Sequence, residues 1–198
     1  MRLVAENLAL ERGGRQLFSG LGFVLAAGSL TRLTGPNGSG KTSLLRLIAG
    51  LADHTEGRLQ LEGGDEELGI GAQAHFIAHQ EAVKPALSML ENLQFWQGFM
   101  GAGDAMSALS AFGLERLASL PAAWASEGQR RRLALARLAL AARPLWLLDE
   151  PTVGLDAASQ ERLNQLMQAH LATGGIILAA THVPLALPSA EIRIGSNS

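Results

Sequence analysis

The sequence predicts an α/β fold in which a mainly parallel sheet is flanked by helices. Short apolar strands alternate with segments of helical periodicity, and this alternation is typical of a parallel sheet covered on both faces. Apolar runs separated by glycine-containing turns come first and predict an N-terminal antiparallel β region. A glycine-broken helical stretch between Pro85 and Pro121 predicts a small helical subdomain, residues 83–128, inserted in one domain over residues 1–198.

The first half of the chain contains three clear strands and one helix after the opening tract. A buried strand is expected over Leu30–Thr34, and leucines at helical spacing then mark a helix that ends near Gly50. Residues 57–63 are predicted to form a short strand between glycines. Residues 74–80 are predicted to form a buried strand that ends at Gln80.

The second half of the chain repeats the alternation. A helix is expected to begin after Ser126, and the apolar strand over residues 144–150 ends in two acids. Apolar residues between 163 and 171 mark a further helix, and residues 174–182 form the last buried strand that we expect. These strands complete the predicted parallel sheet.

Composition and charge exclude several classes of protein. With 198 residues, 47% hydrophobic and 17% charged, the chain can bury a sizeable core and does not resemble a disordered protein. A net charge of -2 gives no basic field, so we expect no nucleic-acid partner. The absence of cysteine excludes disulfides and thiolate metal sites. The most apolar tract, residues 174–188, is interrupted by His182, Pro184 and Pro188, so we expect no membrane span and a cytoplasmic chain.

A phosphate-binding loop is the strongest chemical signal. The run GPNGSGKTS fits the pattern G-x-x-x-x-G-K-[ST], with a strand before it and a helix after it, unlike an ordinary glycine-rich turn. Its glycines let backbone N–H groups close around phosphate oxygens, and the helix start adds positive potential. Lys41 is predicted to reach the β- and γ-phosphates, and the Thr42 hydroxyl to bind Mg²⁺. The predicted nucleotide-binding residues of this P-loop NTPase are Gly35, Pro36, Asn37, Gly38, Ser39, Gly40, Lys41, Thr42 and Ser43.

Two adjacent acids supply the second half of such a site. Asp149 ends the strand LWLLDE, where its carboxylate can hold Mg²⁺ directly or through water. Glu150 follows and can orient or deprotonate an attacking water. Adjacent acids at a strand end are often only solvated, but the phosphate loop upstream favours the catalytic interpretation.

The order of these motifs resembles that of an ATP-binding-cassette (ABC) nucleotide-binding domain over nearly the whole chain. The matching motifs, in order, are GPNGSGKT, Gln80 after a strand, SEGQ before an arginine-rich helix, LWLLDEP, GLDAAS, and His182 after ILAAT. The resemblance implies that ATP and Mg²⁺ are bound, with metal contacts from Thr42, Gln80 and Asp149. It implies that catalysis involves Glu150, His182 and Gln80, and that Asp156 organises a dimer interface.

The same resemblance gives a role to the helix that follows Ser126. In this family the helix points its N-terminus at ATP bound by a second copy, in an ATP-bound homodimer. The implied signature residues here are Ser126, Glu127, Gly128 and Gln129. We interpret the next three residues, Arg130 to Arg132, as a helix start that faces phosphate, with at least one arginine only solvated.

Two positions depart from the family pattern. Glu127 replaces the small residue of the usual Leu-Ser-Gly-Gly-Gln signature, and its carboxylate would repel a triphosphate. We therefore expect its side chain to point to solvent or to pair with Arg130 or Arg131. Arg12 stands near the position where many members stack an aromatic residue on adenine, so it either stacks through its guanidinium or is plain surface.

Within the family, the chain resembles the ATP-binding subunit of the cytochrome c maturation haem exporter. The residues that carry this resemblance are Lys84-Pro85, Leu87, Glu91-Asn92-Leu93 and Phe95-Trp96. It implies integral membrane subunits as partners, a peripheral location on the cytoplasmic face of the inner membrane, and a haem-handling or export step powered by ATP. Some of Leu87, Leu93, Phe95, Trp96, Phe99 and Met100 are expected to dock a membrane subunit, with Leu93 and Trp96 more suited to internal packing.

Three other functions stay open. They are a soluble ABC ATPase acting on ribosomes or DNA, the motor of another small exporter, and a nucleotide-binding regulator without turnover. The single cassette without a basic patch speaks against the first, and the presence of both Glu150 and His182 speaks against the third.

Overall fold

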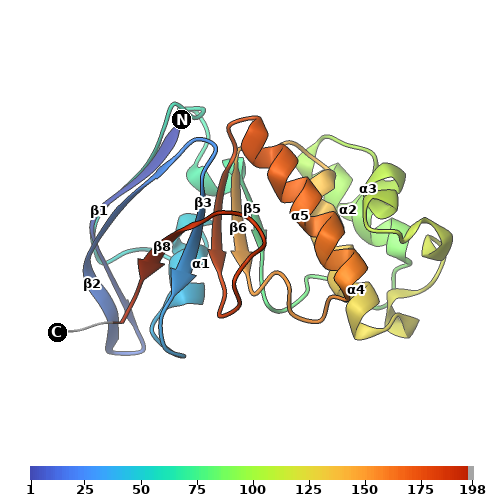
Figure 1. Cartoon of the computed structure of the whole chain (residues 1–198), viewed down its shortest axis with the longest axis horizontal. Helices are drawn as coiled ribbons and strands as arrows, with labels where there is room; N and C mark the ends of the chain where they lie inside the picture. Colours follow the sequence, from blue (N-terminus) through green and yellow to red (C-terminus); the bar gives the residue numbers. More distant parts are fainter. Residues whose placement is uncertain (196–198) are drawn as a thin grey trace. The chain divides into compact units, whose positions relative to one another are not determined.

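The computed structural model describes residues 1–195 (Figure 1). Internal contacts divide the chain into two compact units. The first unit comprises Met1–Phe76, Arg143–Glu150 and Gln168–Ser198, and the second comprises Ile77–Ala142 and Pro151–Met167.

An antiparallel sheet of three strands begins the first unit. Its strands are β1 (Arg2–Arg12), β2 (Arg15–Ala26) and β4 (Glu56–Glu62), in the order β2-β1-β4. Gly13 and Gly14 connect β1 to β2 with φ angles of 60° and 74°, a conformation that a tight hairpin requires and that glycine adopts without strain. The predicted N-terminal antiparallel region is confirmed.

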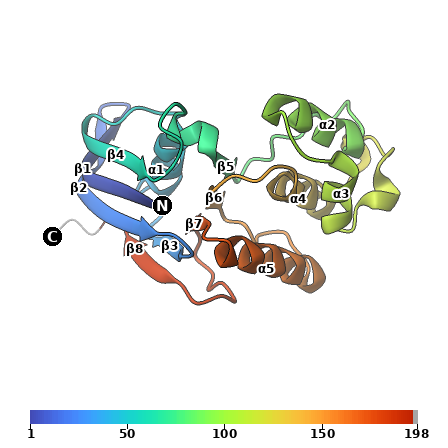
Figure 2. The same ribbon diagram turned by 90° about the horizontal axis from the view of Figure 1, so that it is seen from above.

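A five-stranded sheet forms the centre of the first unit (Figure 2). Its order is β5-β6-β7-β3-β8, with parallel pairing between β6 and β7, β7 and β3, and β3 and β8. The bounds are β3 (Leu30–Thr34), β5 (Ala74–Ile77), β6 (Leu145–Asp149), β7 (Ile176–Ala180) and β8 (Ala190–Arg193). Every residue of β6 and β7 is buried, as expected for central strands of a covered parallel sheet.

Two strand predictions need correction. The strand predicted to reach Gln80 ends at Ile77, so Gln80 lies in the loop that follows β5. The prediction also stopped one strand early, because β8 follows β7 at the edge of the sheet. The residues of β8 are mostly exposed, so they lack the apolar run by which the other strands were recognised.

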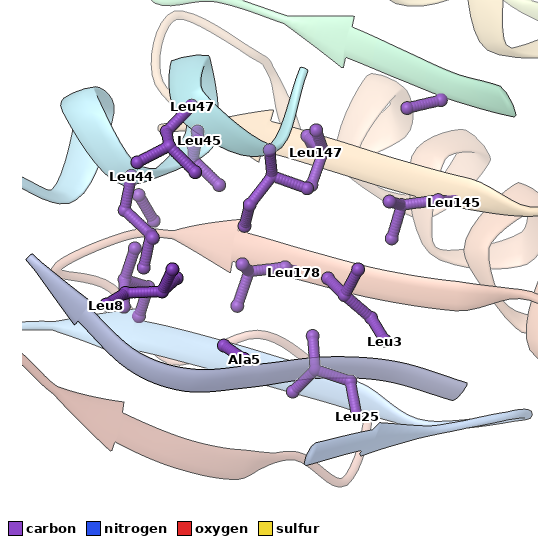
Figure 3. Packing of buried hydrophobic residues seen from close by; sticks show 14 of the residues in the cluster. Leu3, Ala5, Leu8, Leu25, Leu44, Leu45, Leu47, Leu145, Leu147 and Leu178 are labelled. Carbon is purple, nitrogen blue, oxygen red and sulfur yellow. The ribbon is translucent and has the colours of Figure 1, made fainter. Parts of the chain in front are cut away.

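The core of the first unit lies between its two sheets and helix α1 (Lys41–Ile48). Leucines of α1 pack beside Leu147 of β6, and Leu178 of β7 lies against side chains of β1 and β2 (Figure 3). The apolar spacing along α1 thus holds the residues that precede it against the carboxyl end of the sheet, where ligands bind in open α/β folds.

Helices make up most of the second unit. These are α2 (Met89–Met100), α3 (Ala105–Ala111), α4 (Glu127–Ala136) and the first part of α5 (Ala157–Ala172). Ser88 begins α2 with a capping box in which Glu91 is the reciprocal partner, and Gly101 ends it with a φ of 69°. Among residues 1–195, no helix is long and apolar enough to cross a membrane.

Candidate nucleotide-binding site

The loop between β3 and α1 presents backbone donors at the helix start. Gly40 precedes α1 with a φ of 104°, and no side chain caps the helix there. The first turn closes with the N–H of Leu44 donating to the Gly40 carbonyl at 2.8 Å, which leaves the earlier N–H groups without an intrahelical acceptor. Gly35 has a φ of 141°, and a side chain there would put Cβ 2.2 Å from the Ile194 carbonyl oxygen. The loop therefore has the open amides and glycines that a phosphate needs.

Two side chains of the same loop match that use. The Lys41 ammonium donates to the carbonyls of Gly35 and Pro36, at 2.7 and 3.0 Å, and its residue is only 9% exposed. The loop is thereby curled around a positive charge. The Ser39 hydroxyl is buried and has no hydrogen-bond partner within residues 1–195. A buried hydroxyl without a partner is costly, and a phosphate oxygen would satisfy it, so the loop fits a nucleotide.

A hydroxyl and a carboxylate meet next to the loop. The Thr42 hydroxyl donates to Oδ2 of Asp149 at 2.9 Å, and Asp149 is 4% exposed at the end of β6. Magnesium prefers such oxygen ligands and keeps waters and substrate phosphates for its remaining positions. In the described chain no group of three histidine or acidic side chains could hold a metal by itself, and a site of this kind does not need one.

Glu150 and His182 approach each other at the same end of the sheet. Oε1 of Glu150 lies 3.6 Å from Nε2 of His182. Glu150 is held in the left-handed region, with a φ of 47°, and its N–H donates to the Ala180 carbonyl at 2.8 Å. A non-glycine residue in this region stores strain of a kind that clusters at functional sites. Glu150 is a candidate base, and His182 is a polar group that can hydrogen-bond the same water molecule.

A cavity of the first unit adjoins the loop. It has a volume of about 400 Å³ and its lining includes Arg12, Ser43, Arg46 and Asp53. Ser43 is one of the predicted nucleotide-binding residues, so the cavity adjoins the predicted site. Arg12, which the sequence left as either a stacking group or plain surface, lines this cavity.

The signature residues lie in the second unit, at the start of α4. The Ser126 hydroxyl accepts from the Gln129 N–H at 3.2 Å, and Gln129 Oε1 accepts from the Ser126 N–H at 2.8 Å. This capping box leaves the Ser126 hydroxyl proton without an acceptor among residues 1–195. A side chain at Gly128 would put Cβ 3.2 Å from the Gly154 carbonyl oxygen, so glycine also serves a close approach of two loops.

Asp156 caps a helix in the same unit. Its Oδ1 accepts from the Ser159 N–H at 2.8 Å, and the hydrogen bonds from Ser159 hold the pKa of the Asp156 carboxyl below its usual value. The sequence suggested a role for Asp156 between two copies. The structure adds a local one at the start of α5.

The three arginines of α4 are not arranged as the sequence suggested. Arg130 Nε lies 3.6 Å from Oε2 of Glu81, so its acidic partner is Glu81 and not Glu127, which is exposed. Arg131 is 4% exposed and donates to the Ala78 carbonyl at 2.9 Å, and Arg132 donates to the Phe112 carbonyl at 3.3 Å. The expectation that at least one is merely solvated is therefore wrong, because each binds the chain's own groups.

Sequence reasoning also missed Glu81. It lines a cavity of about 280 Å³ together with Gln80, Glu127 and Arg130. The sequence does show an acid directly after Gln80, which could have marked Glu81 as a candidate. Its partner, Arg130, could not be predicted from the sequence.

Comparison with known proteins places this geometry in a family. A model of the family described as ABC transporter matches residues 18–153. A protein of Nitrobacter winogradskyi named cytochrome c biogenesis ATP-binding export protein CcmA is 53% identical over 197 residues, which is 98% of both chains. Proteins of the same name from Mesorhizobium japonicum and Rhodopseudomonas palustris are 54% and 55% identical, again over 98% of both chains.

Solved structures agree. The ATP-binding subunit of an ABC transporter superposes with a TM-score of 0.83 at 26% identity, covering 92% of this chain and 80% of the other. An ATP-binding cassette captured as a post-hydrolysis dimer with ADP and Pi superposes with a TM-score of 0.77 at 26% identity, covering 91% and 88%.

Proposed function

We propose that this chain, which belongs to the ABC transporter family and, within it, to the cytochrome c biogenesis ATP-binding export proteins, is the ATP-hydrolysing subunit of a membrane export complex. It binds ATP and couples hydrolysis to a transport step in cytochrome c biogenesis. One observation carries the proposal. The 2.9 Å contact between Thr42 and Asp149 joins the phosphate loop to the strand end that also holds Glu150.

The residues of the first unit divide the chemistry among them. The loop amides and Lys41 bind and neutralise the phosphates, and Thr42 and Asp149 would hold Mg²⁺. Gln80, which belongs to the second unit, would be a further ligand. When bound, Mg²⁺ neutralises charge that develops on the phosphate oxygens. Glu150 accepts the proton of the attacking water, and His182, 3.6 Å away, orients that carboxylate and contacts the γ-phosphate.

The second unit supplies the signature. In an ATP-bound homodimer, Ser126 donates its hydroxyl proton to the γ-phosphate bound by the other copy, and Asp156 lies at the interface. The capping box supports this use because it holds the Ser126 side chain in place and consumes none of its donor capacity.

Helix α2 is the proposed contact for integral membrane subunits. Phe99 is 72% exposed and Phe95 44% exposed, whereas Leu93 is 1% exposed and belongs to the core. Trp96 is half-buried, with the Arg137 guanidinium 3.7 Å from its ring centroid, and so also packs internally. The two exposed phenylalanines fit a partner helix, which would hold the chain at the cytoplasmic face of the inner membrane.

Coexpression with the membrane subunits tests the proposal. We expect phosphate release by the chain, a higher rate in the complex, and recovery in the membrane fraction only when those subunits are present. The Phe99→Ser variant should weaken coassembly and spare ATP binding. Loss of both properties would instead identify Phe99 as a packing residue, and absence of ATP hydrolysis in both states would refute the proposed function.

The transported group is tested separately. We propose that the complex serves a haem-handling or export step, as the relatives' names point to cytochrome c biogenesis. In a strain that lacks the chain, haem attachment to cytochrome c should fail, and the Glu150→Gln variant should not restore it. Normal attachment in that strain would assign the chain to another exporter.

A further inference from the structure

The segment that carries Gln80 is fastened to the signature helix at two points within the second unit. The buried Arg131 donates to the carbonyl of Ala78, two residues before Gln80, at 2.9 Å. Arg130 lies 3.6 Å from Glu81, one residue after Gln80. Gln80 itself is exposed between these two attachments.

Arg130 also reaches the residue that precedes the signature. Its Nη1 donates to the Ala125 carbonyl at 2.5 Å, while its Nε faces the Glu81 carboxylate. One guanidinium therefore connects the residue after Gln80 with the residue before Ser126. The planar fork of arginine presents donors in two fixed directions, so one side chain serves both partners.

We propose that Glu81 is a positioning residue that, through Arg130, holds the Gln80 segment and the start of the signature helix as one piece. The inference rests on the proposed roles of Gln80 and the signature, and it adds a physical connection between them. When Gln80 engages nucleotide and metal bound by its own copy, the position of Ser126 toward the other copy's ATP is set by the same ion pair.

The proposal separates two quantities that a packing role would change together. The phosphate loop, Lys41, Thr42 and Asp149 belong to the first unit, so MgATP binding by the single chain depends on Glu81 only weakly, through Gln80. Dimerisation driven by ATP depends on the placement of Ser126 and therefore depends strongly on Glu81. Loss of the pair should weaken the dimer and change the affinity of the single chain for MgATP only slightly.

A double-mutant cycle in the full chain tests this, with Glu150→Gln as the background so that ATP is not consumed. The variants are Glu81→Gln, Arg130→Gln and both together, with Glu115→Gln as a matched control because Glu115 is an exposed acid of the same unit without an ion pair in the described chain. The readouts are MgATP affinity by nucleotide fluorescence, dimer dissociation constant by sedimentation, and melting temperature.

We expect Glu81→Gln to weaken the ATP-bound dimer by roughly fivefold to tenfold, a usual coupling for residues in contact. MgATP affinity should stay within about twofold. The melting temperature should change little, because glutamine keeps the size of the side chain. The double variant should lose no more than Arg130→Gln alone, and Glu115→Gln should match the background.

Different failures identify different errors. If Glu81→Gln dimerises like the background, or if the two losses add, the positioning role is wrong. If Glu81→Gln lowers the melting temperature and MgATP affinity together, Glu81 is a packing residue and the inference is overturned. If the background chain binds ATP and forms no dimer, the proposed function itself fails and the inference falls with it.

Discussion

The two helix starts that face phosphate in the proposed mechanism are built in opposite ways. Helix α1 begins at Gly40 without a side-chain cap, and its first turn contains no acid. Helix α4 begins at Ser126 with a complete capping box, and its first turn contains Glu127. The start of α1 is open and needs a ligand for its donors, whereas the start of α4 is satisfied by its own side chains.

The basic side chains near the two helix starts also differ. Lys41 is curled into the loop before α1, where its charge faces the proposed phosphates. Three arginines follow the start of α4, but they are committed to Glu81 and to backbone carbonyls. An anion site that works alone therefore needs free donors and a local cation, while a site completed by a second copy can be stable before its ligand arrives.

The largest expected effect comes from Glu150, the proposed base, which belongs to the same unit as α1. Glu150→Gln removes the base and keeps the shape of the side chain, so turnover should fall roughly a hundredfold or more. ATP binding should survive, and the ATP-bound dimer should accumulate. Phosphate release and gel filtration measure the two results. A variant that hydrolyses ATP within about threefold of the wild type would show that Glu150 is not the base.

Two serine substitutions should separate the open start from the capped one. Ser126→Ala removes an N-cap, so the melting temperature should fall by about 2–4 °C, which corresponds to about 1 kcal/mol. Ser39→Ala removes a hydroxyl without a partner, so stability should hold while ATP affinity falls roughly threefold to tenfold. Calorimetry and nucleotide titration measure both. Equal losses of stability in the two variants would abolish the distinction between the helix starts.

The acid at the start of α4 sharpens the contrast. Glu127 is exposed and is not the partner of Arg130, so in the proposed dimer its charge would lie unneutralised near the ATP of the second copy. At about 4 Å such repulsion is about 1 kcal/mol in water, so Glu127→Ala should tighten ATP-dependent dimerisation roughly threefold to tenfold. The gain should shrink as salt rises. An unchanged or weaker dimer would mean that the acid supports the helix start instead.

The smallest expected effect is a pH dependence of stability in the first unit, the unit that contains α1. His170 stacks on Trp146 at 3.9 Å between ring centroids, and burial lowers the pKa of His170 below its ordinary 6.5. The unfolded chain then binds the proton more readily, so this contribution to stability is complete above pH 6.5 and is lost as the pH falls below it. The melting temperature should drop slightly on acidification. His170→Gln should flatten that change, and an equal drop in this variant would exclude His170 as its source.

Much of the fold and of the first-unit site could be read from local pattern. Leu30–Thr34 was predicted with the bounds that the structure shows, because this short run carries Leu30 and Leu33 and lies between turn glycines in an alternating chain. The phosphate loop was equally clear, since glycines, lysine and threonine at fixed spacing determine the local backbone. The sequence was less informative where burial changes gradually, which is why the strand before Gln80 was drawn too long and β8 was missed.

The sequence by itself determined most of the individual strands, the phosphate loop and the acids at the end of β6, because each depends on residues that are neighbours along the chain. Only the tertiary structure decided the partners of the arginines in α4. Arg130 and Glu81 are far apart in sequence, and either Glu127 or Glu81 could have neutralised the guanidinium. Long flexible side chains choose partners by the packing of the segments that carry them, and that packing is not a local property of the sequence.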